Sequence, residues 1–152
     1  MFTKLFLAST IVLSLPASAK SLERGKYLVR IMGCNDCHTP MYAMKGGQVP
    51  EADWLKGTDV GFNGPWGTTY PANLRQIAQS MDEKSWVSYL KNFQARPPMP
   101  SYDTNRLAEA DMRDIYRFIK SLGPAEFAVP AFLPPGVTPK TPYIDFSVHA
   151  PK

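Results

Sequence analysis

Both cysteines of the chain and one of its two histidines stand within five residues, in the order Cys34-x-x-Cys37-His38. Side chains of these types can form a disulfide, act as a redox dithiol, bind a metal ion or hold a covalent haem. A disulfide needs no adjacent histidine, and a thioredoxin-like dithiol sits beside a βαβ pattern, which this sequence lacks. Zinc takes four ligands, usually from two separated pairs, and only His149 remains to help.

The order Cys-x-x-Cys-His is the attachment signature of a c-type haem. Both thiols add to the vinyl groups of the haem, and the neighbouring imidazole then reaches the iron from one face. We therefore predict one covalent haem c, with Cys34 and Cys37 as its thioether residues and His38 as an axial iron ligand.

The second axial ligand separates an electron carrier from a haem enzyme, because a carrier keeps its iron six-coordinate, typically with methionine opposite histidine. We predict Met99, which lies in the segment ARPPMPSYD. The prolines of this segment fix φ and remove amide donors, so the loop holds its thioether at little entropic cost. Met112 fits a helical stripe better, and Met41 and Met44 follow the motif too closely to reach around the ring. The remaining alternatives are Met32, Met81 and His149.

The elements that position these residues are predicted to be helices. Apolar residues recur at helical spacing over 22–32, 86–93 and 112–122. Gly33 ends the first helix just before the haem motif, and Gly123-Pro124 stops the last. Ser80-x-x-Glu83 has the pattern of a capping box before the middle helix.

Residues 40–79 contain many glycines and prolines and show no sustained period, so we predict a loop that wraps the haem. Within this loop and just before Met99, five side chains are candidate haem contacts: Trp66, Tyr70, Asn73, Arg75 and Arg96. The arginines could form charge-assisted bonds with the propionates. The predicted fold class is all-α, with few helices and long loops that enclose the haem.

The N-terminal segment has the features of a secretory signal. Lys4 precedes an apolar run over 5–15, and Ala17-Ser18-Ala19 provides an Ala-x-Ala exit. The run is about half of the roughly 20 residues that span a membrane. We expect residues 1–19 to be cleaved and the mature chain, without a membrane span, to work in the periplasm. Lys and Arg do not cluster with aromatic residues, so nucleic-acid binding has no support.

The C-terminal segment, residues 125–152, differs in texture from the predicted haem domain, residues 20–124. It is rich in proline and carries spaced large apolar side chains, among them Phe132, Tyr143 and Phe146. Such a segment forms neither a helix nor a core alone. Two uses fit such a segment, wrapping its own domain or docking onto a partner subunit; plain disorder is the third possibility, and its large apolar side chains argue against full solvation. We expect wrapping.

Three stretches resemble a class I cytochrome c: RGKYLVRIMGCNDCHT, GPWGTTYPANL and PPMPSYDTNRLAEADMRDIYRFIKSLGP. They are most similar to the haem domains in cytochrome subunits of bacterial alcohol and gluconate dehydrogenases. The resemblance implies that the first and last helices cross beside the haem, with Gly25 permitting close contact near Tyr116. It also implies the thioether and axial roles given above. Those subunits carry three haem motifs and this chain has one, and Arg75-Gln76-Ile77 replaces the family's usual Thr-Pro-Asp.

The expected function is one-electron transfer in the periplasm, without enzymatic activity. The expected partners are redox proteins: a dehydrogenase as donor and an oxidase or another cytochrome as acceptor. Two alternatives stay open, a dedicated electron-accepting subunit of a dehydrogenase complex and a haem enzyme or sensor with an open iron site.

Overall fold

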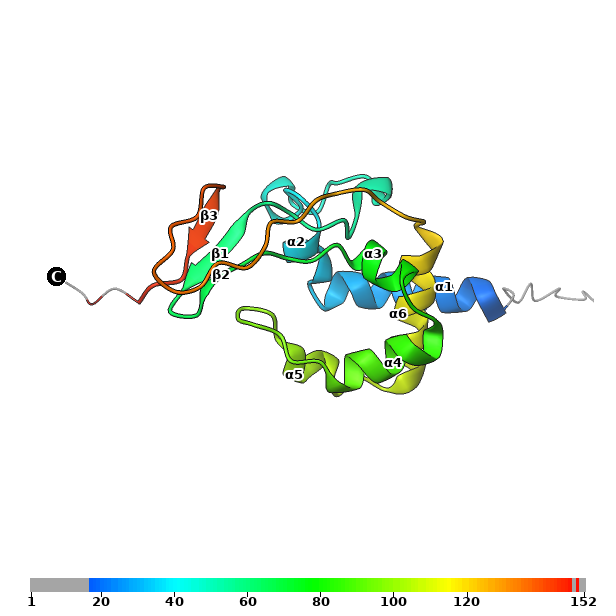
Figure 1. Ribbon diagram of the computed structural model, residues 1–152. Coiled ribbons are helices and arrows are strands. Elements are labelled where there is room, and N and C mark those ends of the chain that lie inside the picture. Colours follow the sequence, from blue (N-terminus) through cyan, green and yellow to red (C-terminus); the bar gives the residue numbers. More distant parts are fainter. Residues whose placement is uncertain (1–16, 149, 151–152) are drawn as a thin grey trace, which may run out of the picture.

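The structure, a computed structural model, describes residues 17–148 and 150. Its helices are α1 (Ala17–Ile31), α2 (Cys34–His38), α3 (Leu74–Gln79), α4 (Glu83–Asn92), α5 (Ser101–Thr104) and α6 (Glu109–Ser121), with short 3-10 turns at Ala43–Lys45 and Glu51–Asp53 (Figure 1). A small sheet has the order β2 (Gly67–Thr69), β1 (Gly61–Gly64), β3 (Tyr143–Asp145). None of the described helices is long and apolar enough to cross a membrane.

Helices α1 and α6 cross and pack against each other (Figure 1). The crossing is close because Gly25 of α1 has no side chain. An added Cβ there would overlap the carbonyl oxygen of Asp114 and lie 2.8 Å from Cβ of Phe118. The predicted crossing of the first and last helices is confirmed, and its tightest contact lies within one turn of Tyr116.

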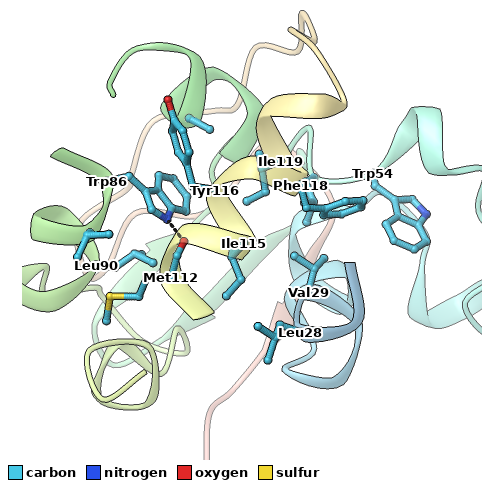
Figure 2. Close-up of a cluster of buried hydrophobic side chains, with 13 residues drawn as sticks. Leu28, Val29, Trp54, Trp86, Leu90, Met112, Ile115, Tyr116, Phe118 and Ile119 are labelled. Carbon is cyan, nitrogen blue, oxygen red and sulfur yellow. Dashed lines mark hydrogen bonds between the residues drawn. The ribbon is translucent and has the colours of Figure 1, made fainter. Parts of the chain in front are cut away.

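The hydrophobic core lies around α6 (Figure 2). Met112 is fully buried, and its carbonyl accepts a hydrogen bond of 3.1 Å from Nε1 of Trp86. On the other side of α6, Phe118 packs with Val29 of α1. The stripe read from the sequence thus faces the core, and Met112 is a core residue as predicted.

The predicted capping box at Ser80 and Glu83 is wrong. The N-cap of α4 is Asp82, whose carboxylate accepts a hydrogen bond of 2.7 Å from the amide of Ser85. Ser80 instead closes α3 by donating its hydroxyl to the carbonyl of Ile77 at 2.8 Å. Helix α4 ends at Asn92, one residue before Phe93, the end predicted from the apolar spacing.

The prediction of a loop over 40–79 is also wrong in part, because the range contains β1, β2 and α3. The strands pair antiparallel, with Phe62 opposite Thr69. The N-cap of α3 is Asn73, whose side-chain oxygen accepts a hydrogen bond of 3.0 Å from the amide of Gln76. These elements are only three to six residues long. They are too short to produce a period that sequence inspection can detect.

The C-terminal extension runs back along the domain from the end of α6 to β3 (Figure 1). β3 pairs parallel with β1, placing Ile144 beside Phe62. The ring centroid of Phe146 lies 5.8 Å from that of Phe62 and 5.9 Å from that of Trp66. The described part of the extension therefore wraps its own domain, which is one of the two uses expected from its sequence.

Removing the extension should weaken the domain strongly. A chain that ends after Ala125 loses β3 and the contacts of Phe146. At about 25 cal/mol per Å² of apolar surface, exposure on the order of a few hundred Å² lowers the free energy of unfolding by several kcal/mol. Denaturant unfolding of the haem-loaded chains measures the difference, with a chain ending after Val148 as the control that keeps β3. Equal midpoints for both chains would show that wrapping contributes no stability.

Candidate functional site

The two cysteines lie on one turn, α2, directly after α1. Gly33 joins the helices in the left-handed conformation, with φ of 69°, which glycine adopts without steric cost. Cys34 and Cys37 are three residues apart, so their side chains share one face of the turn. They form no disulfide with each other, and both are partly buried.

The environment of the thiols does not match a redox dithiol. Burial raises the pKa of Cys34 to about 11, and burial raises the pKa of Cys37 as well. Reactive dithiols work through a thiolate whose pKa is lowered. Among residues 17–148 and 150, no three His, Cys, Asp or Glu side chains cluster as metal ligands would. His149, the remaining histidine, lies outside the described residues.

His38 is buried, and its ring is held by the main chain. Nδ1 of His38 lies 2.8 Å from the carbonyl oxygen of Ala72, to which it donates in the matching tautomer. Such a bond leaves Nε2 with the lone pair that binds a metal, and it fixes the orientation of the ring. Burial lowers the pKa of His38, which favours the neutral imidazole that acts as a ligand.

The segment around Leu55 is hydrogen-bonded to the chain near His38 and to the chain near Ala72. The amide of Leu74 donates to the carbonyl of Leu55 at 2.9 Å, and the amide of Gly57 donates to the carbonyl of His38 at 2.8 Å. The amide of Leu55 donates to the hydroxyl of Thr39 at 2.8 Å. The relative position of His38 and Ala72 is therefore set by two main-chain hydrogen bonds and one to the Thr39 hydroxyl, which sequence inspection could not have found.

Met99 lies on a short turn that leads into α5. Its amide donates to the carbonyl of Arg96 at 3.2 Å, and its carbonyl accepts from the amide of Ser101 at 2.9 Å. Figure 1 shows this loop, which precedes α5, projecting toward β1 and β2. The side chain is partly buried, whereas Met44 is 82% exposed and Met112 is fully enclosed in the core.

Three of the five predicted haem contacts meet at one pocket of about 710 Å³. Tyr70, Asn73 and Arg96 line it, together with Ala72, whose carbonyl holds His38. The extension contributes residues 126–130 and Phe132 to the lining. Thr69 is another lining residue, and its hydroxyl oxygen is buried without a hydrogen-bond partner.

Arg75 and Trp66 do not line this pocket. The guanidinium of Arg75 donates to four carbonyls, those of Leu122, Gly123 at 2.8 Å, Pro124 at 3.0 Å and Ala52 at 2.8 Å. It thereby closes the C-terminal end of α6, where carbonyls lack helical partners. Nε1 of Trp66 is buried and unpaired, and its ring packs on Phe146. Their contacts with a haem remain predictions.

The arrangement fits a group attached through two sulfurs and bound by an imidazole. The two cysteines share one face of α2, and the tautomer of His38 that donates Nδ1–H to Ala72 leaves Nε2 free to bind a metal. The pocket beside Ala72 is lined by three of the predicted haem contacts and not by the cysteines, His38 or Met99. A family model described as cytochrome c matches residues 22–123. The match includes the α2 turn and Met99, and it ends where the extension begins. Neither the curated proteins nor the solved structures that were searched gave a match.

Proposed function

Because the chain belongs to the cytochrome c family, we propose that it is a periplasmic one-electron carrier whose haem iron is bound by His38 and Met99. The fold is that of a small cytochrome c domain, and the family binds haem c covalently. The chain has one attachment motif, and hence one haem. When bound, the haem supplies an iron that cycles between the ferric and ferrous states.

The observation that carries the proposal is the fixed imidazole of His38. A ring held by the Ala72 carbonyl keeps its ligand geometry in both oxidation states, which suits a carrier that changes little on electron transfer. Met99 is supported by its hydrogen-bonded turn and partial burial. A soft thioether favours the ferrous state and raises the reduction potential.

A spectroelectrochemical titration of the haem-loaded chain tests the function. We expect one reversible step that follows the Nernst equation for a single electron, and no turnover of hydrogen peroxide with an organic reductant. The control is the same chain with Met99→Ala, which opens an iron position. Peroxidase turnover by the wild type at the level of that variant would favour the haem enzyme instead.

A dedicated electron-accepting subunit of a dehydrogenase complex is the second candidate. The observation that favours it is the exposed outer surface of the extension, where Tyr143 is 47%, Ile144 49% and Phe146 40% exposed. Large apolar side chains exposed close together in the chain make this segment a candidate interaction site. Purification of the tagged chain from its own cells distinguishes the two, because a subunit retains its dehydrogenase and a free carrier does not.

A further inference from the structure

We propose that Phe132 of the extension is a positioning residue for the Met99 loop, which it holds through the guanidinium of Arg96. The extension would then set how firmly the thioether competes with other ligands for the iron. This inference rests on the proposed function, since it takes Met99 as the axial ligand.

The contact between Arg96 and Phe132 is close. The guanidinium carbon of Arg96 lies 4.0 Å from the ring centroid of Phe132, against 5.6 to 5.9 Å for the other cation–ring pairs of the described residues. A planar guanidinium at this distance is attracted by the negative face of the ring and stacks on it. The contact joins residues that are far apart in the sequence.

Arg96 and Met99 move as one unit because a single turn contains both. The amide of Met99 donates to the carbonyl of Arg96 at 3.2 Å. Pro97 and Pro98, which lie between them, have fixed φ angles and no amide hydrogen. A displacement of Arg96 is therefore passed to the thioether rather than absorbed within the loop.

Phe132 is in turn anchored to the β1–β2 hairpin through its neighbour Leu133. Leu133 and the fully buried Thr68 exchange two backbone hydrogen bonds, of 2.8 and 3.1 Å. Gly67 leaves no space for a side chain against the backbone of Leu133 and Pro134. The backbone next to Phe132 is thus fastened to β2.

Both axial candidates are consequently held by the wall of one pocket. Ala72, Arg96 and Phe132 all line it. The carbonyl of Ala72 holds His38, and the Arg96–Phe132 contact restrains the turn that carries Met99. Phe132 lies outside residues 22–123, so this restraint is an addition to the matched domain.

The test is imidazole binding to the ferric, haem-loaded chain, followed through loss of the far-red sulfur-to-iron absorption band. Phe132→Leu and Arg96→Gln should each tighten imidazole binding roughly two- to five-fold, the range that loss of an exposed cation–ring contact implies. The double variant should bind no tighter than either single variant, because both remove the same contact. Phe132→Tyr keeps the ring and should bind as the wild type does.

Phe146→Leu is the matched control, because it makes the same change in the same extension at a ring that contacts Phe62 and Trp66 instead. It should leave imidazole binding unchanged. Additive effects in the double variant, wild-type binding in Phe132→Leu, or an equal effect of Phe146→Leu would overturn the restraint alone. A wild type without the far-red band would overturn the ligation by Met99, and the restraint with it.

Discussion

Replacement of both Cys34 and Cys37 by alanine is expected to leave almost no protein with stably bound haem. The two thioethers are the covalent links that the motif provides, and the chain has no other cysteine. Without them the haem is held by axial ligands and packing alone, so it can dissociate. Single replacements leave one thioether and an intermediate yield. Acid–acetone extraction measures the result, since it removes free haem and leaves covalent haem on the protein.

Asp36→Asn is the control for this experiment, because Asp36 is an exposed residue of the same turn between the two cysteines. It should keep its haem through the extraction. A wild type that releases its haem into the organic phase, or a double variant that retains it, would contradict covalent attachment through these sulfurs.

The helices and the attachment motif could be predicted because their signals are local. The stripe from Met112 to Leu122 repeats over several turns, and Gly123 follows it in the left-handed conformation, with φ of 73°. Local signals also mislead when two candidates compete. Ser80 and Asp82 both suit the start of a helix, and the choice of Asp82 depends on where α3 ends.

The contacts that hold the site could not be predicted, because they join distant main-chain atoms. The carbonyl of Ala72, 34 residues away in the sequence, is hydrogen-bonded to the His38 ring. Any residue type could supply that carbonyl. Arg75 was expected near a propionate, since its charge suits one. Its observed partners, the carbonyls at the end of α6, have no sequence signal.

The path of the extension was left open by the sequence for a similar reason. Its prolines exclude a helix, but pairing with a strand some 80 residues earlier depends on the hairpin already being formed. Ile144 of β3 lies beside Phe62 of β1. The two strands are far apart in the sequence and become neighbours only when the chain folds. Short strands with distant partners leave little trace in a local pattern.

Replacement of Met99 by alanine should change the iron site more than any other single substitution outside the attachment motif. Water or a small anion takes the vacated position and stabilises the ferrous state less than a thioether does. We expect the reduction potential to fall by more than about 59 mV, a tenfold shift of a one-electron equilibrium. Carbon monoxide should then bind the ferrous variant, and we expect the wild type to exclude it.

Met112→Leu is the matched control, since Met112 is fully buried among the helices. A swap that nearly conserves volume should cost under about 1.5 kcal/mol of unfolding free energy. It should leave the potential and carbon monoxide binding as in the wild type. Loss of the sulfur ligand in Met112→Leu would move the assignment from the loop to the core.

The ferric absorption spectrum in the far red, recorded for the haem-loaded wild type and for Met99→Ala, tests the account most directly. A low-spin wild type with the weak sulfur-to-iron band, and a variant without it, is the predicted result. An unchanged band in Met99→Ala, or a wild type that is already high-spin, would contradict a carrier with His38 and Met99 as its axial ligands.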